Sequence, residues 1–204
     1  MRYPAAETAE KHQRILQEAA RLFRERGFSG VSVAEIMKAT GLTHGPFYNH
    51  FASKEALMQE SFEYRAQTTL AGIDEAAATP AGLLDYVDHY LSVQHRDNPA
   101  LGCLVSALAT EIAREETVRP SLTRLVAATV ERLTRYFPWR SNKHARGDAI
   151  RLHASMVGGI ILARAVNDEA FSREILREVN AGIQRFARAG AAGNDNVQGG
   201  RVEN

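Results

Sequence analysis

The spacing of hydrophobic positions predicts helices along almost the whole chain. Between residues 8 and 26, Ile15, Ala19, Leu22 and Phe23 recur at the spacing of one helix face. Beyond residue 52, the same spacing predicts helices at about 53–76, 80–95, 99–114, 117–136, 144–167 and 170–188, separated by proline, glycine or aspartate. No segment alternates with a period of two, so no β-sheet is predicted. We therefore expect an all-α protein of about nine helices.

The segment that starts at Ser32 predicts two short helices joined by a tight turn. Ser32 and Glu35 have the spacing of a capping box, which begins the first helix. Gly41 can supply the positive φ that closes this helix, and Thr43 can cap the second. If Thr43 is the cap, Pro46 falls where its missing N–H removes no intrahelical bond. Two helices joined by a short turn that contains glycine form a helix-turn-helix.

The second of these helices has one apolar side and one polar side. Phe47 and Phe51 lie four residues apart and can point inward together. Ser53 can cap the following helix, which places Lys54 at its first position. A cation there interacts unfavourably with the helix dipole, at a cost in free energy of about 0.3–1 kcal/mol. The position is favourable instead if Lys54 and the helix N-terminus face the same phosphate. A solvated lysine is the alternative, and the local sequence leaves both open.

These residues carry a resemblance to a known family. The run GLTHGPFYNHFASKEAL, preceded by RERGFSGVSVAEI, resembles the N-terminal domain of TetR-type transcriptional repressors. The resemblance implies a three-helix DNA-binding domain on a dimeric, ligand-binding helical body, with Tyr48 and Lys54 at phosphates and the start of the Thr43 helix at the bases. Pro46 departs from the small or hydroxylated residue of many relatives. The candidate DNA-binding residues are Ser32, Thr43, His44, Gly45, Pro46, Tyr48, Asn49, His50 and Lys54.

We expect two domains and a tail. Residues 9–69 form the helix-turn-helix domain, and residues 70–188 form the ligand-binding and dimerisation domain. Residues 189–204 are rich in glycine and asparagine without apolar periodicity, which predicts a disordered tail.

Composition limits the class of protein. The chain has 204 residues, of which 45% are hydrophobic, and this is enough to bury a sizeable core. It has one cysteine, which excludes an internal disulfide and fits a reducing compartment. Since no apolar stretch is long enough to cross a membrane and the first residues lack a signal-peptide core, we expect a soluble, cytoplasmic protein without a membrane partner.

Net charge alone does not indicate DNA binding. Residues 1–60 contain eight lysines and arginines against seven acidic residues. Affinity for DNA must therefore come from local placement of Lys11, Arg14, Lys38 and Lys54, from backbone amides, and from the doubling of contacts in a dimer.

A strip of small residues predicts a close helix contact. Ser155, Gly159 and Ala163 recur every four residues, and Gly158 and Gly159 each cost a helix about 1 kcal/mol relative to alanine. We predict a dimer interface in which this strip meets the last helix; close packing within one chain is the alternative. The predicted interface consists of Ser155, Gly159, Ala163, Ile175, Val179, Ile183 and Phe186.

Polar and aromatic residues of the body are candidates for an inducer pocket, although each could equally be an ordinary core or surface residue. They are Tyr86, His89, Tyr90, Cys103, Glu111, Trp139, His153 and Met156. Cys103 lies near a helix start, where a thiol can become a reactive thiolate; the alternative is a small buried residue. His89 and His95 lie six apart and do not share a helix face, so we expect no metal site, and we expect no cofactor.

Three classes of function remain. We expect a ligand-responsive repressor that binds a palindromic operator as a homodimer and leaves it when a small-molecule inducer binds; sensing of oxidants or electrophiles by Cys103 is the alternative input. A ligand-free architectural DNA-binding protein is the second class, although it would not need a large body. An all-α enzyme is the third class, but the chain lacks the GxSxG, HExxH, GxxxxGK[ST] and GxGxxG motifs. We expect no catalytic residues.

Overall fold

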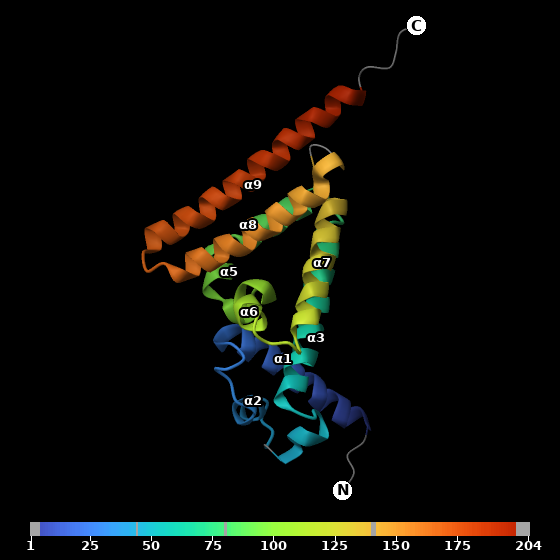
Figure 1. The fold of residues 1–204 in the computed structure, drawn as a ribbon, viewed down its shortest axis with the longest axis vertical. Helices are drawn as coiled ribbons and strands as arrows, with labels where there is room; N and C mark the ends of the chain where they lie inside the picture. The colour runs from blue at the N-terminus through green and yellow to red at the C-terminus, as the bar shows by residue number, and fades with distance from the viewer. Residues whose placement is uncertain (1–4, 44, 80, 140–141, 199–204) are drawn as a thin grey trace. The chain divides into compact units, whose positions relative to one another are not determined.

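The fold is all-helical, as the hydrophobic spacing predicts. A computed structural model describes residues 5–43, 45–79, 81–139 and 142–198 (Figure 1). Within these ranges the chain forms α-helices and short 3-10 helices and contains no strand. The α-helices are α1 (Ala5–Arg26), α2 (Val33–Ala39), α3 (Lys54–Ala76), α4 (Gly82–Tyr90), α5 (Val93–Asp97), α6 (Leu104–Ile112), α7 (Arg119–Tyr136), α8 (Ala145–Ala165) and α9 (Glu169–Gln198). The 3-10 helices are η1 (Gly45–Asn49), η2 (Pro99–Leu101) and η3 (Asn142–His144).

The chain divides into two compact units, and the division differs in part from the prediction. Unit 1 consists of Met1–Thr69 and Asn98–Leu125, and unit 2 consists of Leu70–Asp97 and Val126–Asn204. The first segment of unit 1 ends at Thr69, the position of the predicted boundary. Unit 1 also includes η2, α6 and the first part of α7, which the sequence analysis assigned to the body.

The core of unit 1 joins the helix-turn-helix to α1, α3 and α6. Helix α1 contributes a fully buried stripe that includes Ile15, Ala19 and Phe23. Phe47 of η1 and Leu108 of α6 are also buried. Burial of such side chains stabilises the unit, because each large apolar side chain removed from water contributes about 1.5–3 kcal/mol.

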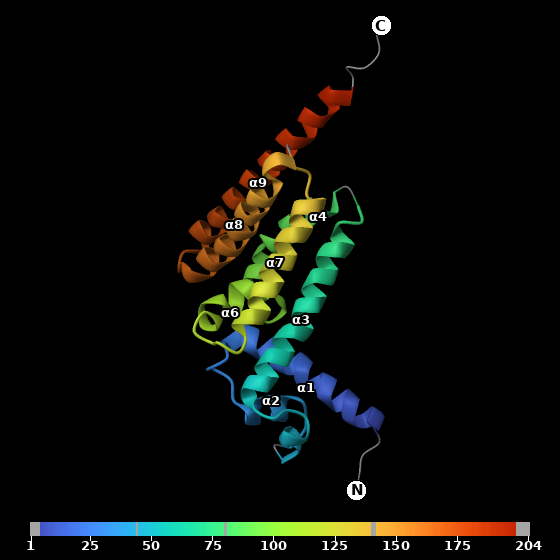
Figure 2. The ribbon, with the colours of Figure 1, turned by 45° about the vertical axis from the view of Figure 1, so that its right-hand side comes forward.

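In unit 2, α8 and α9 run side by side along most of their lengths (Figures 1 and 2). Gly159 makes this close approach feasible. A Cβ built on Gly159 would lie 3.2 Å from Leu91 Cδ2 and 3.4 Å from Val179 Cγ1 of the same chain. The small-residue strip at Gly159 therefore packs within one chain, which is the alternative to the predicted dimer contact.

Three predicted segments differ from the structure. The helix predicted at 80–95 is interrupted after Tyr90, and the chain continues as α5. The helix predicted at 99–114 begins as the 3-10 helix η2, and α6 starts only at Leu104. Residues 189–198, the first part of the predicted tail, belong to α9, which continues to Gln198. Residues 199–204 of the predicted tail lie outside the described ranges.

Candidate nucleic-acid interface

Helix α2 begins at the predicted capping box. The Ser32 hydroxyl accepts a hydrogen bond from the Glu35 N–H (3.2 Å), and the Ser32 N–H donates to Glu35 Oε2 (2.8 Å). The Ser32 hydroxyl also donates to Glu35 Oε2 (2.8 Å), and the bonds that the Ser32 N–H and hydroxyl donate to the Glu35 carboxyl lower its pKa to about 2. Ser32, a candidate DNA contact, is thus engaged in starting α2, although it remains exposed.

The turn between the two helices has the geometry that Gly41 predicts. Gly41 has a φ of +72°, and its N–H donates to Lys38 O (3.0 Å). The N–H of Leu42 donates to Met37 O (2.9 Å), which completes a Schellman motif. Because these bonds satisfy the last carbonyls of α2, the chain leaves the helix in one defined direction.

The second element is shorter and tighter than predicted. The prediction of a helix from Thr43 to His50 is wrong in type and extent, because the chain forms the five-residue 3-10 helix η1. The His50 N–H donates to Phe47 O (2.9 Å), as a 3-10 turn requires. Pro46 is the second residue of η1 and has no N–H to donate, so the chain cannot extend an N–H···O ladder back through it.

The outer side of η1 is exposed, and two buried phenylalanine side chains lie beneath it. Phe47 and Phe51 are 0% and 2% exposed, whereas Tyr48 is 67% exposed. Asn49 and Thr43 are also exposed. Residues three apart lie above one another in a 3-10 helix, so Tyr48 lies over the glycine that begins η1. His44 and the ring of Pro46 lie outside what the structure describes.

His50 packs against α1 instead of lying on the outermost surface. Its ring centroid is 5.9 Å from that of His12, and the His12 ring stacks on Phe51 at 4.5 Å. His12 Nε2 lies 3.1 Å from Glu60 Oε2. Partial burial and then the nearby His12 and Lys11 lower the pKa of His50 below its usual value.

Helix α3 starts as predicted, but its first side chain has a protein partner. The Ala56 N–H donates to the Ser53 hydroxyl (3.2 Å), which caps the helix. The Lys54 ammonium donates to the carbonyl of Phe28 (2.7 Å). This bond holds Lys54 at the helix N-terminus, where the positive end of the helix dipole also attracts anions.

The other basic residues named from the sequence have different environments. Lys11 pairs with Glu7 (2.8 Å), and the Arg14 guanidinium donates to Thr40 O at the end of α2. Lys38 is exposed on α2. Arg14 thus has a structural role at the turn, a contact that the spacing of residues does not reveal.

The residues predicted for an inducer pocket do not form one cluster. Tyr86, His89 and Tyr90 lie on α4 and His153 and Met156 on α8, all in unit 2, whereas Cys103 and Glu111 belong to unit 1. The Glu111 carboxylate accepts a hydrogen bond from the N–H of Phe28 (2.7 Å), and its role in an inducer pocket stays a prediction. His89 is exposed, and burial lowers the pKa of His153.

Cys103 is the N-cap of α6 and is half-buried. Arg24 donates to Ala100 O (2.9 Å), three residues before it. Burial lowers the pKa of Arg24 to about 10. Sensing of oxidants or electrophiles by Cys103 stays a prediction.

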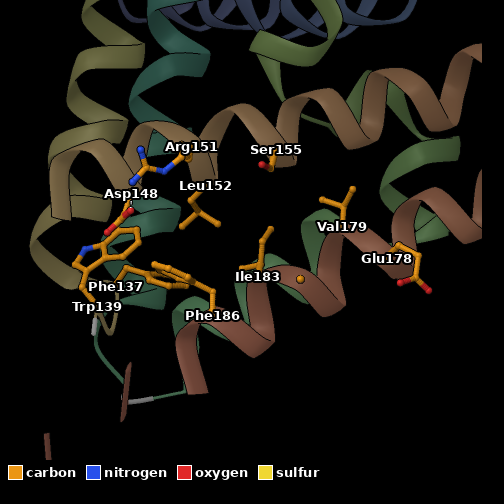
Figure 3. Close-up of a pocket in the computed structure, with 11 residues that line it drawn as sticks. Phe137, Trp139, Asp148, Arg151, Leu152, Ser155, Glu178, Val179, Ile183 and Phe186 are labelled. Carbon is orange, nitrogen blue, oxygen red and sulfur yellow. Dashed lines mark hydrogen bonds and ion pairs between the residues drawn. The ribbon is translucent and has the colours of Figure 1, made fainter. Parts of the chain in front are cut away.

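A cavity of about 350 Å³ lies among the end of α7, α8 and α9. Figure 3 shows Leu152 and Ser155 of α8 facing Ile183 of α9, with aromatic rings gathered at one end. The rings belong to Phe137, Trp139 and Phe186, and the Trp139 indole N–H donates to Leu133 O (2.9 Å). Of the residues predicted for a pocket, only Trp139 lines this cavity.

The residues predicted for a dimer interface divide between interior and surface. Gly159, Ala163 and Ile183 are buried within the chain, and Val179 packs against Gly159. Ser155 and Phe186 are exposed. Sequence reasoning missed a second apolar stripe on α8 that is exposed and consists of Ile150, Ala154, Ile161, Leu162 and Ala165.

Two further features are absent from the described ranges. No helix in them combines the length and apolar character needed to cross a membrane. No group of three or more His, Cys, Asp or Glu side chains in the same residues is arranged to hold a metal ion.

Comparisons with known proteins match this interface to one family. Residues 15–60 match the family model described as bacterial regulatory proteins, tetR family. The chain is 30% identical over 118 residues to the HTH-type transcriptional repressor DhaR of a Mycobacterium species, covering 55% of this chain and 58% of that protein. It is 46% identical over 57 residues to the HTH-type transcriptional regulator AcrR of Shigella flexneri, covering 28% of this chain and 26% of AcrR. The alignments thus span from about a quarter to somewhat over half of these relatives.

The fold as a whole is similar to that of solved regulators. A TetR-family transcriptional regulator from Agrobacterium tumefaciens superposes with a TM-score of 0.73 at 24% identity, covering 88% of this chain and 98% of that one. At this identity the similarity concerns the fold alone.

The packing of His50 predicts that protonation destabilises the fold. Because the folded pKa of His50 is lowered, this contribution to stability is complete above its unfolded pKa of about 6.5 and is lost as the pH falls through the folded pKa. We expect urea unfolding at decreasing pH to show a smaller loss of stability in His50→Gln than in the wild type. His89→Gln, at an exposed position, is the control; equal losses in all three proteins would contradict the prediction.

Proposed function

We propose that this chain, which belongs to the TetR family of bacterial regulatory proteins, represses transcription by binding a palindromic operator as a homodimer and leaves the operator when a small molecule binds its body. The observation that carries the proposal is η1, whose outer residues are exposed while Phe47 and Phe51 anchor it from below. Exposed polar and aromatic side chains on a rigid element are what groove recognition requires.

We assign two kinds of DNA contact. Thr43, Gly45 and Asn49 are exposed near the start and outer side of η1, where they can approach base edges. Tyr48 and Lys54 would contact phosphates, which position the protein without reading sequence. The capped N-terminus of α3 supports the second role, since its backbone N–H groups and Lys54 can act on one anion.

We place the dimer interface on the exposed stripe of α8 together with exposed residues of α9. Ile150 and Leu162 are 50% and 56% exposed, and Phe171 on α9 is 50% exposed. Covering such side chains removes apolar surface from water, which is the main driving force of association. Two copies related by a two-fold axis would then present two η1 elements to successive major grooves about 34 Å apart.

We assign the inducer to the cavity beside Trp139. Its volume of about 350 Å³ is in the range of small-molecule sites. Three aromatic side chains at one end favour a planar apolar molecule, and Asp148 and Arg151 supply polar groups at the rim. Inducer and operator must weaken each other's binding by the same factor, because the coupling between two sites is reciprocal. We propose no catalytic step, in keeping with relatives that are named as regulators.

The operator is the first test. Selection from random DNA should return a palindrome with half-sites one helical turn apart. Selection with Tyr48→Phe should return the same palindrome with lower affinity, because a phosphate contact carries no base information. A changed preferred sequence would contradict the role of Tyr48, and selection of no preferred sequence would contradict the proposed function.

The dimer interface is tested by placing a charge on the stripe. Leu162→Glu should sediment as a folded monomer and bind the operator at least about tenfold more weakly, because one half-site is lost. Leu101→Glu is the matched control, since Leu101 is 69% exposed and lies off the stripe, on η2. If both variants stay dimeric, the interface lies elsewhere.

The inducer site is tested through the chain's single tryptophan. Planar aromatic molecules that quench Trp139 fluorescence should also release the operator. A Cβ at Gly182 would have nothing within 4 Å, so Gly182→Leu can fill the cavity without a backbone clash. This variant should bind such molecules about tenfold more weakly and keep its operator affinity. Gly72→Leu, at another open glycine, is the control. Operator release without quenching would place the inducer at another site.

A further inference from the structure

Glu111 makes an unusual contact for a charged side chain at a helix end. It lies in the last turn of α6, and its Oε2 accepts hydrogen bonds from the backbone N–H groups of Phe28 (2.7 Å) and Ser29 (3.4 Å). These two groups belong to the turn that follows α1. The carboxylate thus serves two amides that would otherwise need water or another acceptor.

The sequence of this turn is adapted to the carboxylate. Gly27 has a φ of +76°, and a Cβ built on it would lie 2.1 Å from Glu111 Oε1. A side chain there would displace the carboxylate of Glu111 and would be strained by the positive φ, so both the contact and the backbone conformation favour glycine. The Phe28 ring is 3% exposed and contacts Phe23 edge-on at 5.1 Å, which fixes the turn from below.

The same turn holds Lys54 from its other side. The carbonyl of Phe28 accepts the Lys54 ammonium (2.7 Å), and this carbonyl shares a peptide unit with the N–H of Ser29 that faces Glu111. A carboxylate at the N–H end of a peptide and a cation at its C=O end polarise the peptide in the same sense. The two charged residues therefore support each other through one peptide plane.

We infer that Glu111 is a positioning residue for DNA binding: by orienting the Phe28–Ser29 peptide, it holds the Lys54 ammonium where a phosphate of the operator can meet it. This inference rests on the proposed function. The ammonium has three N–H donors, and the bond to Phe28 uses one of them, which leaves donors for a phosphate. Helix α6 thereby gains a direct connection to a DNA contact.

The salt dependence of operator binding distinguishes a positioning role of Glu111 from a merely structural one. Each phosphate contact contributes about 0.9 to the slope of log affinity against log salt concentration. Lys54→Ala should therefore reduce the slope by about 1 for each η1 on the operator. Glu111→Ala should reduce the slope in the same direction, and it should have little further effect when Lys54 is already alanine.

The variants to compare are Glu111→Ala, Glu111→Gln, Lys54→Ala and the double variant, each with thermal unfolding as a check of folding. Glutamine keeps an oxygen acceptor, so Glu111→Gln should lie between wild type and Glu111→Ala, and it carries the test if Glu111→Ala does not fold. Glu116→Gln removes an exposed charge just after α6 and should match the wild type. A wild-type slope in folded Glu111 variants, or effects that add fully to Lys54→Ala, would overturn the inference. Absence of operator binding by the wild type would instead overturn the proposed function.

Discussion

The backbone groups at helix ends are the constraint on which this structure depends. A helix leaves four N–H groups and four carbonyls without intrahelical partners, and a chain made of short helices has many such ends. In unit 1, the ends are satisfied by a small set of side chains. Ser32 and Glu35 begin α2, Arg14 serves a carbonyl at its end, and Ser53 begins α3. These bonds also determine where η1 lies, because η1 is the short connection between two helix ends that are already fixed.

This dependence explains which parts of the site could be predicted from the sequence. The capping box at Ser32, the glycine turn at Gly41 and the cap at Ser53 act over a few residues, so local spacing is sufficient to identify them. The type of η1 was missed because the rule that tolerates Pro46 near a helix start holds equally for a 3-10 helix. The partners of Lys54 and Arg14 lie 26 residues away, beyond the reach of any local pattern.

The body shows the same limit for packing. The helical spacing identified α8 as a helix with small residues, but its two adjacent glycines, Gly158 and Gly159, lie on different faces of the helix. A Cβ at Gly159 would meet Leu91 and Val179, whereas a Cβ at Gly158 would meet nothing within 4 Å. Sequence alone cannot say which of two neighbouring strips faces the interior, since this depends on how α9 lies against α8. The cavity beside Trp139 escaped prediction for a similar reason, because its lining comes from α8, α9 and the residues just after α7, and their spacing in the sequence does not show how they pack together.

The contact between Gly27 and Glu111 restricts how the sequence of this protein can diverge. A larger residue at position 27 would displace the carboxylate at position 111 from its place, because a Cβ would overlap it. Conversely, loss of the acid would leave the amides of Phe28 and Ser29 without this acceptor and would weaken the selection for glycine. The two positions, 84 residues apart, should therefore change together among descendants of this chain. Paired substitution at these two positions would therefore reflect a direct contact between residues that are distant in sequence.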